Sequence, residues 1–508
     1  MRRAAAAWLR SRPRVATAGA VALLAVAIWA VYGAGYVGYD QLYALMWGDD
    51  LAEGRLPGYE APRAPTPHPL ANLAGLALAP LGDGSLVAAR AIALVAFAGL
   101  AVAAYALAAR LFSPAVGVLF AALLLTRPSL VNQAQIASVD VPFLALVLAA
   151  AAIEARRPRA GPPVLAVLGL AGLLRPEAWL LAAAYAAHLL RRASPRDRLR
   201  IAALAAAAPL AWLGSDLLVA GDPLWSLHRT REAADRLGDE GGPVATLEWA
   251  VRSWKGLLHV LPAVLSAAGA VLAARLLGRR AAIPLALLGL GVASSLAVGL
   301  AGVPLLTRYF FLPATVLCLL AAVAVLGWRE LPAGRRARRP WKVAGAAAGL
   351  ALLASAPYEL DQVHGALLKT SRGHEVQRDL QSIARRPGVR DLIPRCQPLQ
   401  TRLFRARPLL LWARRDDPPA RIVATRRLDL GAGMLLVYSR EERPPPAPGF
   451  ATVARNRSWE VRARCGGATA SRAAPVRARP SAPRRAATPS APRTGPGPGS
   501  RGRSSRTG

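Results

Sequence analysis

The chain has 508 residues, 54% of them hydrophobic and 18% charged, with a mean hydropathy of +0.31. A chain this long and this apolar is not an ordinary soluble protein. A net charge of +35 would suit a nucleic-acid partner, but the arginines lie between apolar runs and do not form one basic stripe. We therefore expect no nucleic-acid partner and predict a polytopic α-helical membrane protein.

Apolar runs separated by short Arg-rich pieces predict about eleven membrane-spanning helices. They lie at residues 15–34, 86–109, 114–127, 140–154, 162–174, 177–190, 200–220, 255–275, 281–303, 309–328 and 342–357. For the first of them, a removable signal peptide is the alternative interpretation.

The loops indicate the orientation of the chain. If the N-terminus is cytoplasmic, every predicted inner segment is rich in arginine, among them "EARRPRAG", "RRASPRDRLR" and "WRELPAGRRARRPWK". This is the positive-inside pattern. It predicts a multi-pass protein of the bacterial cytoplasmic membrane with its N-terminus inside and its C-terminus outside.

The sequence changes character after the predicted transmembrane domain, residues 1–357. Residues 358–465 hold short β-like runs between Pro-rich turns, which predicts a small extracytoplasmic α+β domain. Residues 466–508 are almost entirely Ala, Pro, Arg, Ser, Gly and Thr, a composition typical of a disordered tail. Cys396 and Cys465 both fall in the outer domain, where disulfides persist, and we predict that they pair.

Acidic residues gather in the first outer loop, "GYDQLYALMWGDDLAEGRLPGYE", residues 38–60. Asp40 lies closest to the first span, at the predicted outer face of the membrane. The simplest interpretation of the stretch is a solvated loop, in which Asp49 and Asp50 start or cap a surface helix. The alternative is that Asp40 carries out chemistry at the membrane surface.

The order of several short motifs resembles the GT-C superfamily of membrane glycosyltransferases, which includes the protein mannosyltransferase, aminoarabinose transferase and RgtA-like families. The matching segments cover roughly residues 15–330. They are the early Asp40, "LAEGRLP", "PHPL", "ASVDVPFLALVLAAAA", "LLRPEAWLL" and "LTRYFFLP". The resemblance implies that Asp40 is the catalytic base. The family pattern often has an acid after this aspartate, whereas Gln41 follows it here.

The remaining candidate site residues lie at the predicted outer ends of spans, except His68, which lies in the first outer loop. Arg175, Arg308 and His68 are candidates to bind the donor phosphate, because guanidinium groups match phosphate oxygens. Headgroup anchoring is the alternative for the arginines, and a structural role for the histidine. Asp140 and Glu177 are candidates to bind the acceptor or a divalent cation. Their alternatives are a helix-dipole interaction for the aspartate and an ion pair with the nearby Arg175 for the glutamate.

We therefore expect a membrane glycosyltransferase that moves a sugar from a polyprenyl-phosphate donor to the hydroxyl of an extracytoplasmic acceptor. No nucleotide-sugar pool exists outside the cytoplasmic membrane, so the donor must be a lipid, and the acceptor a glycan or protein of the cell envelope. A divalent cation is the one cofactor considered, and no zinc or nucleotide-binding motif occurs. The alternative is a non-catalytic polytopic membrane protein, either a transporter or a degenerate GT-C-like scaffold.

Overall fold

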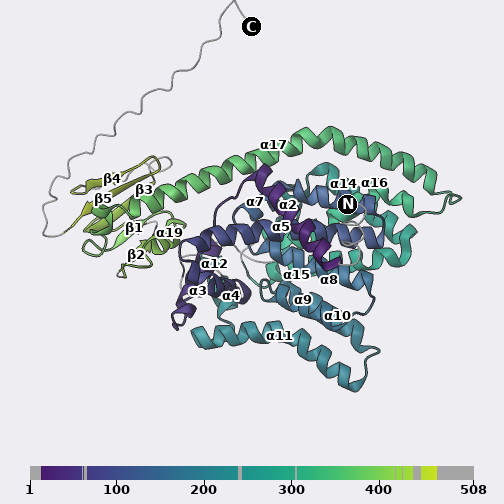
Figure 1. Ribbon diagram of the computed structural model, residues 1–508, viewed down its shortest axis with the longest axis horizontal. Helices are drawn as coiled ribbons and strands as arrows, with labels where there is room; N and C mark the ends of the chain where they lie inside the picture. The colour runs from purple at the N-terminus through teal and green to yellow at the C-terminus, as the bar shows by residue number, and fades with distance from the viewer. Residues whose placement is uncertain are drawn as a thin grey trace, which may run out of the picture. The chain divides into compact units, whose positions relative to one another are not determined.

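The computed structural model describes residues 13–59, 61, 66–237, 243–303, 306–417, 419–425, 427–438 and 448–465. These residues belong to one compact unit, Met1–Gly466, made of many helices and one small sheet (Figure 1). The fold is the predicted one: a helical membrane protein followed by a small α+β region. The predicted disordered tail lies outside the described residues.

Within the described part of the chain, six helical segments are long and apolar enough to cross a membrane, or seven if one bent pair counts as a span. The six are Arg14–Tyr32, Gly84–Leu111, Pro195–Ala220, Val260–Leu300, Thr307–Glu330 and Arg338–Ala384. The predicted count of eleven stays a prediction. Several predicted spans form helices of only 11 to 14 residues, shorter than the roughly 20 residues of a full crossing.

The centre of the helical part is α16 (Phe311–Leu326), which is apolar on every face and almost wholly buried. Such a helix has to be surrounded by others. It packs against α14 (Val260–Leu272) and α15 (Ala282–Leu300). The approach of α14 needs Gly269, since a Cβ there would lie 1.9 Å from the Leu320 carbonyl oxygen. The long helix α5 (Gly84–Leu111) packs in the same core against α2 (Pro13–Tyr32), α6 (Pro114–Leu125) and α8 (Asp140–Arg156).

The other helices complete the bundle and its outer connections. They are α2 (Pro13–Tyr32), α6 (Pro114–Leu125), α7 (Pro128–Gln135), α8 (Asp140–Arg156), α9 (Pro162–Gly172), α10 (Glu177–Leu190), α11 (Pro195–Ala220), α12 (Trp225–Leu237) and α13 (Pro243–Leu258). Short 3₁₀ or π turns occur at Ala79–Leu81 (η1), Ala273–Leu277 (η2), Gly278–Ala281 (η3), Thr307–Phe310 (η4) and Gly327–Glu330 (η5).

The segment predicted to be the first outer loop contains two helices, α3 (Tyr39–Ala52) and α4 (Pro69–Leu78), which cross closely. Their contact depends on Gly48 and Gly75, because a Cβ on Gly48 would lie 2.2 Å from the backbone of Gly75. The acidic stretch is therefore not an open solvated loop. Asp40 sits in the first turn of α3, and the other aspartates of this helix sit in its last turn.

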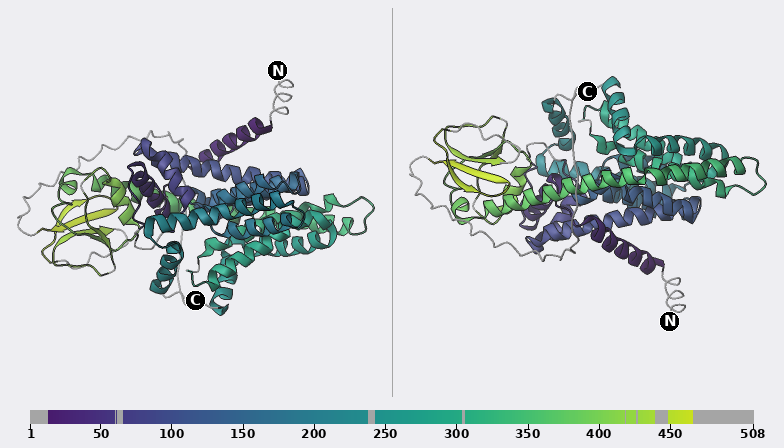
Figure 2. Two further views of the ribbon diagram at one scale, coloured as in Figure 1. Left: turned by 90° about the horizontal axis from the view of Figure 1, so that it is seen from below. Right: turned by 90° about the horizontal axis from the view of Figure 1, so that it is seen from above.

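A helix of 47 residues, α17 (Arg338–Ala384), runs from the bundle to the sheet (Figure 2). It passes through residue 357, where we placed the boundary between the first two domains; these boundaries stay predictions. The sheet has the order β2-β1-β3-β5-β4, with parallel pairs around β1 and antiparallel pairs around β5. The elements of this region are α18 (Pro387–Arg390), α19 (Ala406–Ala413), β1 (Leu399–Thr401), β2 (Ile422–Ala424), β3 (Gly433–Tyr438), β4 (Ala451–Arg455) and β5 (Trp459–Arg464).

The sheet region shares an apolar core with α3 and the end of α17, and Trp412 and Trp459 are almost fully buried in it. The predicted disulfide between Cys396 and Cys465 is confirmed: it joins cysteines 69 positions apart whose Cα atoms lie 5.2 Å apart. It ties the chain before β1 to the end of β5. Cys318 is buried in α16, as expected of a packing residue.

Candidate functional site

Arg175 lies at the break between α9 and α10, where Pro176 interrupts the helical backbone hydrogen bonds. Its guanidinium group forms an ion pair with Asp140 at the start of α8. Its Nη2 and Nε donate to Glu177 Oε1 at 2.6 and 3.0 Å. All three side chains are at most 6% exposed, and Ser138 Oγ donates to Asp140 at 2.7 Å. The structure therefore joins three predicted site residues in one buried charged cluster.

A second ion pair joins residues 268 positions apart: Arg308 Nη1 lies 2.9 Å from Asp40 Oδ2. Asp40 is in the first turn of α3, where the helix dipole favours an acid. Arg308 is in η4, which leads into the buried helix α16. Both side chains are a little over a quarter exposed, so solvent reaches this pair but does not reach the cluster around Arg175.

His68 precedes α4 and is buried, and its Nδ1 atom has no hydrogen-bond partner in the described part of the chain. Burial lowers the pKa of His68 from its usual 6.5 to about 4, an effect that the charge of Asp40 opposes and those of Arg308 and Arg175 reinforce. The imidazole is therefore neutral at pH 7. It lies within electrostatic range of both predicted phosphate-binding arginines.

A cavity of about 340 Å³ brings these groups together. Five predicted site residues line it: His68, Asp140, Arg175, Glu177 and Arg308. Asp40 does not line this cavity but contacts it through its ion pair with Arg308. We call it the arginine cavity. Its two guanidinium groups, in largely apolar surroundings, suit an anionic group joined to an apolar chain.

Sequence reasoning missed other residues of the arginine cavity. Tyr309 places its ring 5.1 Å from the Arg175 guanidinium, a cation–π contact. Trp212 packs edge-to-face against His68 and Trp179. Tyr309 was visible inside the "LTRYFFLP" motif, next to Arg308. Nothing in the sequence singles out Trp212, which lies in the middle of the apolar helix α11.

The carboxylates of this region do not form a metal site. Asp140 and Glu177 pair with Arg175, and Asp40 pairs with Arg308, so each carboxylate already has a guanidinium partner that a cation would have to displace. Among the described residues, no group of three or more His, Cys, Asp or Glu side chains could hold a metal ion. The arrangement of these residues does not match a divalent-cation site. That a divalent cation takes part in the reaction stays a prediction.

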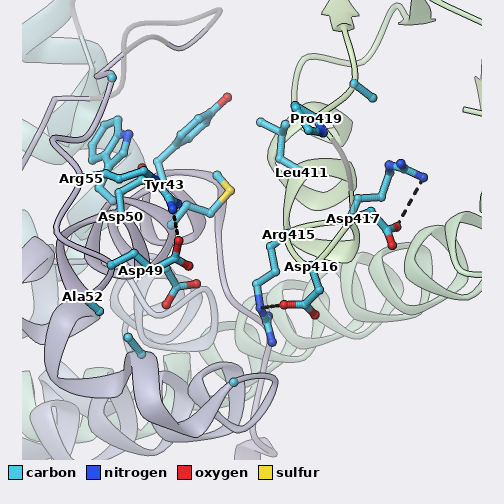
Figure 3. Close-up of a pocket in the computed structure, with 18 of the residues that line it drawn as sticks. Tyr43, Asp49, Asp50, Ala52, Arg55, Leu411, Arg415, Asp416, Asp417 and Pro419 are labelled. Carbon is cyan, nitrogen blue, oxygen red and sulfur yellow. Dashed lines mark hydrogen bonds and ion pairs between the residues drawn. The ribbon is translucent and has the colours of Figure 1, made fainter. Parts of the chain in front are cut away.

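A second, larger cavity of about 980 Å³ lies between α3 and the α19 region of the sheet domain (Figure 3). We call it the loop pocket. Tyr43, Trp47, Asp49 and Asp50 line one side, and Leu411 is on the other. The remaining lining residues are Met46, Ala52, Glu53, Arg55, Gly58, Ala79, Pro80, Gly82, Arg407, Arg414, Arg415, Asp416, Asp417, Pro419, Ala420 and Ile422.

The two walls of the loop pocket are joined by polar contacts. Arg407 Nη1 donates to the Tyr43 hydroxyl at 2.8 Å. Asp83, at the start of α5, pairs with Arg385 at 3.0 Å and with Arg415 at 3.1 Å. These contacts fix the sheet domain against the first outer loop, so the loop pocket is a defined cavity.

Comparison with known proteins gives a structural likeness alone. No family model matches the chain, and no curated protein does. The chain is similar to the crystal structure of ArnT from Cupriavidus metallidurans in the apo state, with 16% identity, a TM-score of 0.46, and coverage of 91% of this chain and 98% of that one. It is also similar to the structure of the same protein bound to undecaprenyl phosphate, with 15% identity, a TM-score of 0.45, and coverage of 88% and 98%.

Proposed function

We propose that this protein is a membrane glycosyltransferase that moves a sugar from a polyprenyl-phosphate donor to a hydroxyl group of an extracytoplasmic acceptor. The observation that carries the proposal is the convergence of motifs far apart in the sequence. Arg175, Arg308 and His68 line one cavity, and Asp40 is bound to that cavity's edge through Arg308. The order of the motifs suggested this grouping, and the contacts support it.

The two arginines are suited to the departing phosphate. When the glycosidic bond breaks, its electron pair remains on the phosphate oxygen, and nearby guanidinium groups stabilise that charge. Arg175 is rigidly held by two buried carboxylates and an aromatic ring. Arg308 is the more exposed of the two and has Asp40 as its acidic partner. A phosphate that enters the cavity would therefore compete with Asp40 for Arg308.

This competition gives Asp40 its proposed role as general base. Once Arg308 turns toward the donor phosphate, the Asp40 carboxylate is free to accept the proton of the acceptor hydroxyl. The acceptor oxygen then forms the new bond to the sugar carbon, and the bond from that carbon to the phosphate oxygen breaks. His68, neutral at pH 7, supplies an uncharged hydrogen-bonding group beside the phosphate.

The test replaces Asp40 by Asn, which keeps the shape of the side chain but removes the base. We expect transfer from a radiolabelled polyprenyl-phosphate sugar, measured in membranes, to fall about 100- to 10,000-fold. Asp361→Asn is the matched control, because Asp361 is exposed on α17 and outside both cavities. Full activity of Asp40→Asn at an unchanged protein level would refute the assignment of the base.

The second candidate is a non-catalytic relative with the same architecture. The observation in its favour is the closed Asp40–Arg308 ion pair next to Gln41, whose Nε2 atom is buried with no hydrogen-bond partner among the described residues. A scaffold would keep this pair for stability alone. Wild-type membranes that transfer no sugar, while Asp40→Asn lowers only the thermal stability, would favour this candidate.

The chain is a multi-pass membrane protein, and we propose that its N-terminus is inside and residues 358–508 are outside. Contacts between predicted inner segments support their placement on one common side, and the Arg-rich composition of that side supports its assignment to the cytoplasm. Arg110 donates to the Ala155 carbonyl, and Arg280 pairs with Glu330, so these segments meet at shared faces of the bundle. Reporter fusions after Pro340 and Tyr358 test it: a fusion after Tyr358 that is active only in the cytoplasm would reverse the orientation.

A further inference from the structure

The proposed reaction leaves the loop pocket without a role, although its lining is rich in charged and aromatic groups (Figure 3). Most of these charges are satisfied by one another. Arg55 pairs with Asp50 and Glu53, and Asp417 accepts from Arg390 and lies 3.5 Å from Arg414. The pocket is therefore polar without a dominant sign of charge.

Asp49 is the exception. Its carboxylate forms no hydrogen bond or ion pair with any residue that the structure describes, although the charge of Arg415 acts on it from a distance. Burial raises the pKa of Asp49, as expected for a carboxylate that has lost water without gaining a direct partner. The group is available to accept hydrogen bonds from a ligand.

The lining selects the chemistry of that ligand. An anion would meet the unpaired carboxylate of Asp49, and a strongly cationic ligand would meet four arginines. A neutral ligand rich in hydroxyl groups can donate to the carboxylates and accept from the guanidinium groups, with no net charge to bury. Tyr43 and Trp47 are only 2% and 5% exposed, with ring centroids 5.5 Å apart, so they form the apolar floor beneath the polar groups of the pocket.

Helix α3 connects the loop pocket to the proposed base. Asp40, Tyr43 and Trp47 follow one another at helical spacing, so they lie along one side of the helix. Asp49 lies nine residues after Asp40, roughly 14 Å along the axis and about two and a half turns on, so its side chain leaves α3 on the opposite side from Asp40. A ligand that contacts both ends must be an extended chain, not a single small molecule.

We propose that the loop pocket binds the acceptor, a neutral and hydroxyl-rich glycan chain, and that Asp49 is a positioning residue that accepts hydrogen bonds from its hydroxyl groups. The inference rests on the proposed glycosyl transfer and names the acceptor side of that reaction. The chain end that receives the sugar lies toward Asp40, and the remainder of the glycan lies between α3 and α19.

The first test fills the loop pocket. Gly58 lines it, is exposed, and has no atom within 4 Å of an added Cβ, so Gly58→Trp starts a large side chain at the pocket wall from an open position. Gly388 is the matched control, since it is equally open but lies in α18, away from the pocket. We expect Gly58→Trp, but not Gly388→Trp, to raise the acceptor KM at least about tenfold and to leave donor binding unchanged.

The second test removes one charge. Asp49→Asn should raise the acceptor KM about tenfold, the effect of losing a hydrogen bond to a charged group, with little change in kcat. Asp361→Asn is again the control. A fall in kcat with an unchanged KM would assign Asp49 to the chemical step and overturn its positioning role.

Direct binding separates this inference from the proposed function. The purified full-length protein is applied to an array of neutral oligosaccharides and to the same array carrying carboxylate groups. Binding of neutral members that is lost in Gly58→Trp supports the pocket, even if no transfer is detected. Unchanged binding in Gly58→Trp, or preference for the acidic array, refutes the pocket, and loss of transfer in Asp40→Asn would still support the enzyme.

Discussion

The arginine cavity and the loop pocket use the same kinds of residues in opposite ways. In the arginine cavity, Arg175 is 6% exposed and is held by two carboxylates that are at most 5% exposed. In the loop pocket, Arg55 is 58% exposed and its partner Asp50 is 30% exposed. The first arrangement is rigid and shielded from water, and the second is hydrated and adjustable.

The difference shows which ion pairs matter for stability. Exposed pairs contribute little, because water solvates the separated charges almost as well. A buried pair contributes little relative to an apolar replacement, but the loss of one partner strands the other charge in a medium that cannot solvate it. The arginine cavity should therefore be sensitive to single substitutions, and the loop pocket should tolerate them.

The largest expected effect comes from Arg175→Met, which leaves Asp140 and Glu177 buried without their cation. We expect a loss of about 3 to 5 kcal/mol in the free energy of unfolding, seen as a lower Tm in detergent. The triple variant Arg175→Met, Asp140→Asn, Glu177→Gln should recover much of that stability but no transfer activity. If Arg175→Met alone were as stable as the wild type, the proposed difference between the two regions would be refuted.

The disulfide comes next, because it stabilises the sheet domain that forms one wall of the loop pocket. Replacing Cys396 and Cys465 by Ser opens a loop of 69 residues, at an expected cost of about 4 kcal/mol in the chain-entropy model. Thermal unfolding with and without reductant measures this, and Cys318→Ala is the control. Mass mapping without reductant should show one cross-linked peptide pair; two free thiols would contradict the bond.

The third prediction concerns the pH dependence of stability that the burial of His68 should cause. The unfolded chain protonates His68 near its usual pKa of 6.5, whereas the folded chain does so only at about 4. Between these values the unfolded state binds more protons, so stability falls as the pH decreases from 6.5 to 4, by about 3 kcal/mol in total. Tm measured across this range should fall less in His68→Gln than in wild type. His228→Gln is the control, since His228 is 53% exposed; equal slopes in all three proteins would contradict the burial effect.

The smallest effect is expected at Asp83, which joins the bundle to the sheet domain from a position that is 54% exposed. Asp83→Asn should lower the free energy of unfolding by less than about 1 kcal/mol. The measurement is again Tm in detergent, with Asp361→Asn alongside it. A loss as large as that of Arg175→Met would mean that exposed pairs carry more of the stability than the comparison allows.

The sequence predicted those parts of the site that depend on local order. The "LLRPEAWLL" motif placed Arg175 two residues before Glu177, and the order of the motifs brought Asp40 and Arg308 into the same hypothesis. The contact between Arg175 and Asp140 could not be read from it, since residues 35 positions apart meet only through the packing of α8 against α9.

The loop pocket could not be predicted from the sequence for the same physical reason. Its walls come from residues 43–82 and 407–422, and no local pattern shows that these segments face each other. The expected solvated loop was therefore an incomplete description of Asp49 and Asp50. Helix lengths were also hard to predict, because apolar composition does not show where a proline or glycine ends a helix before it has crossed a membrane.

The long helix α17 connects the bundle to the sheet domain, so a bend within this helix would move the sheet domain. Its 47 residues extend roughly 70 Å, and Pro357 lies in its interior, where it removes a backbone hydrogen-bond donor. The 27 residues beyond that proline extend about 40 Å, so a bend of about 10° at Pro357 would shift the tip by about 7 Å. Such a bend would have to break the contacts of Asp83 with Arg385 and Arg415 and of Tyr43 with Arg407, so the contacts that close the loop pocket also hold this helix in one conformation.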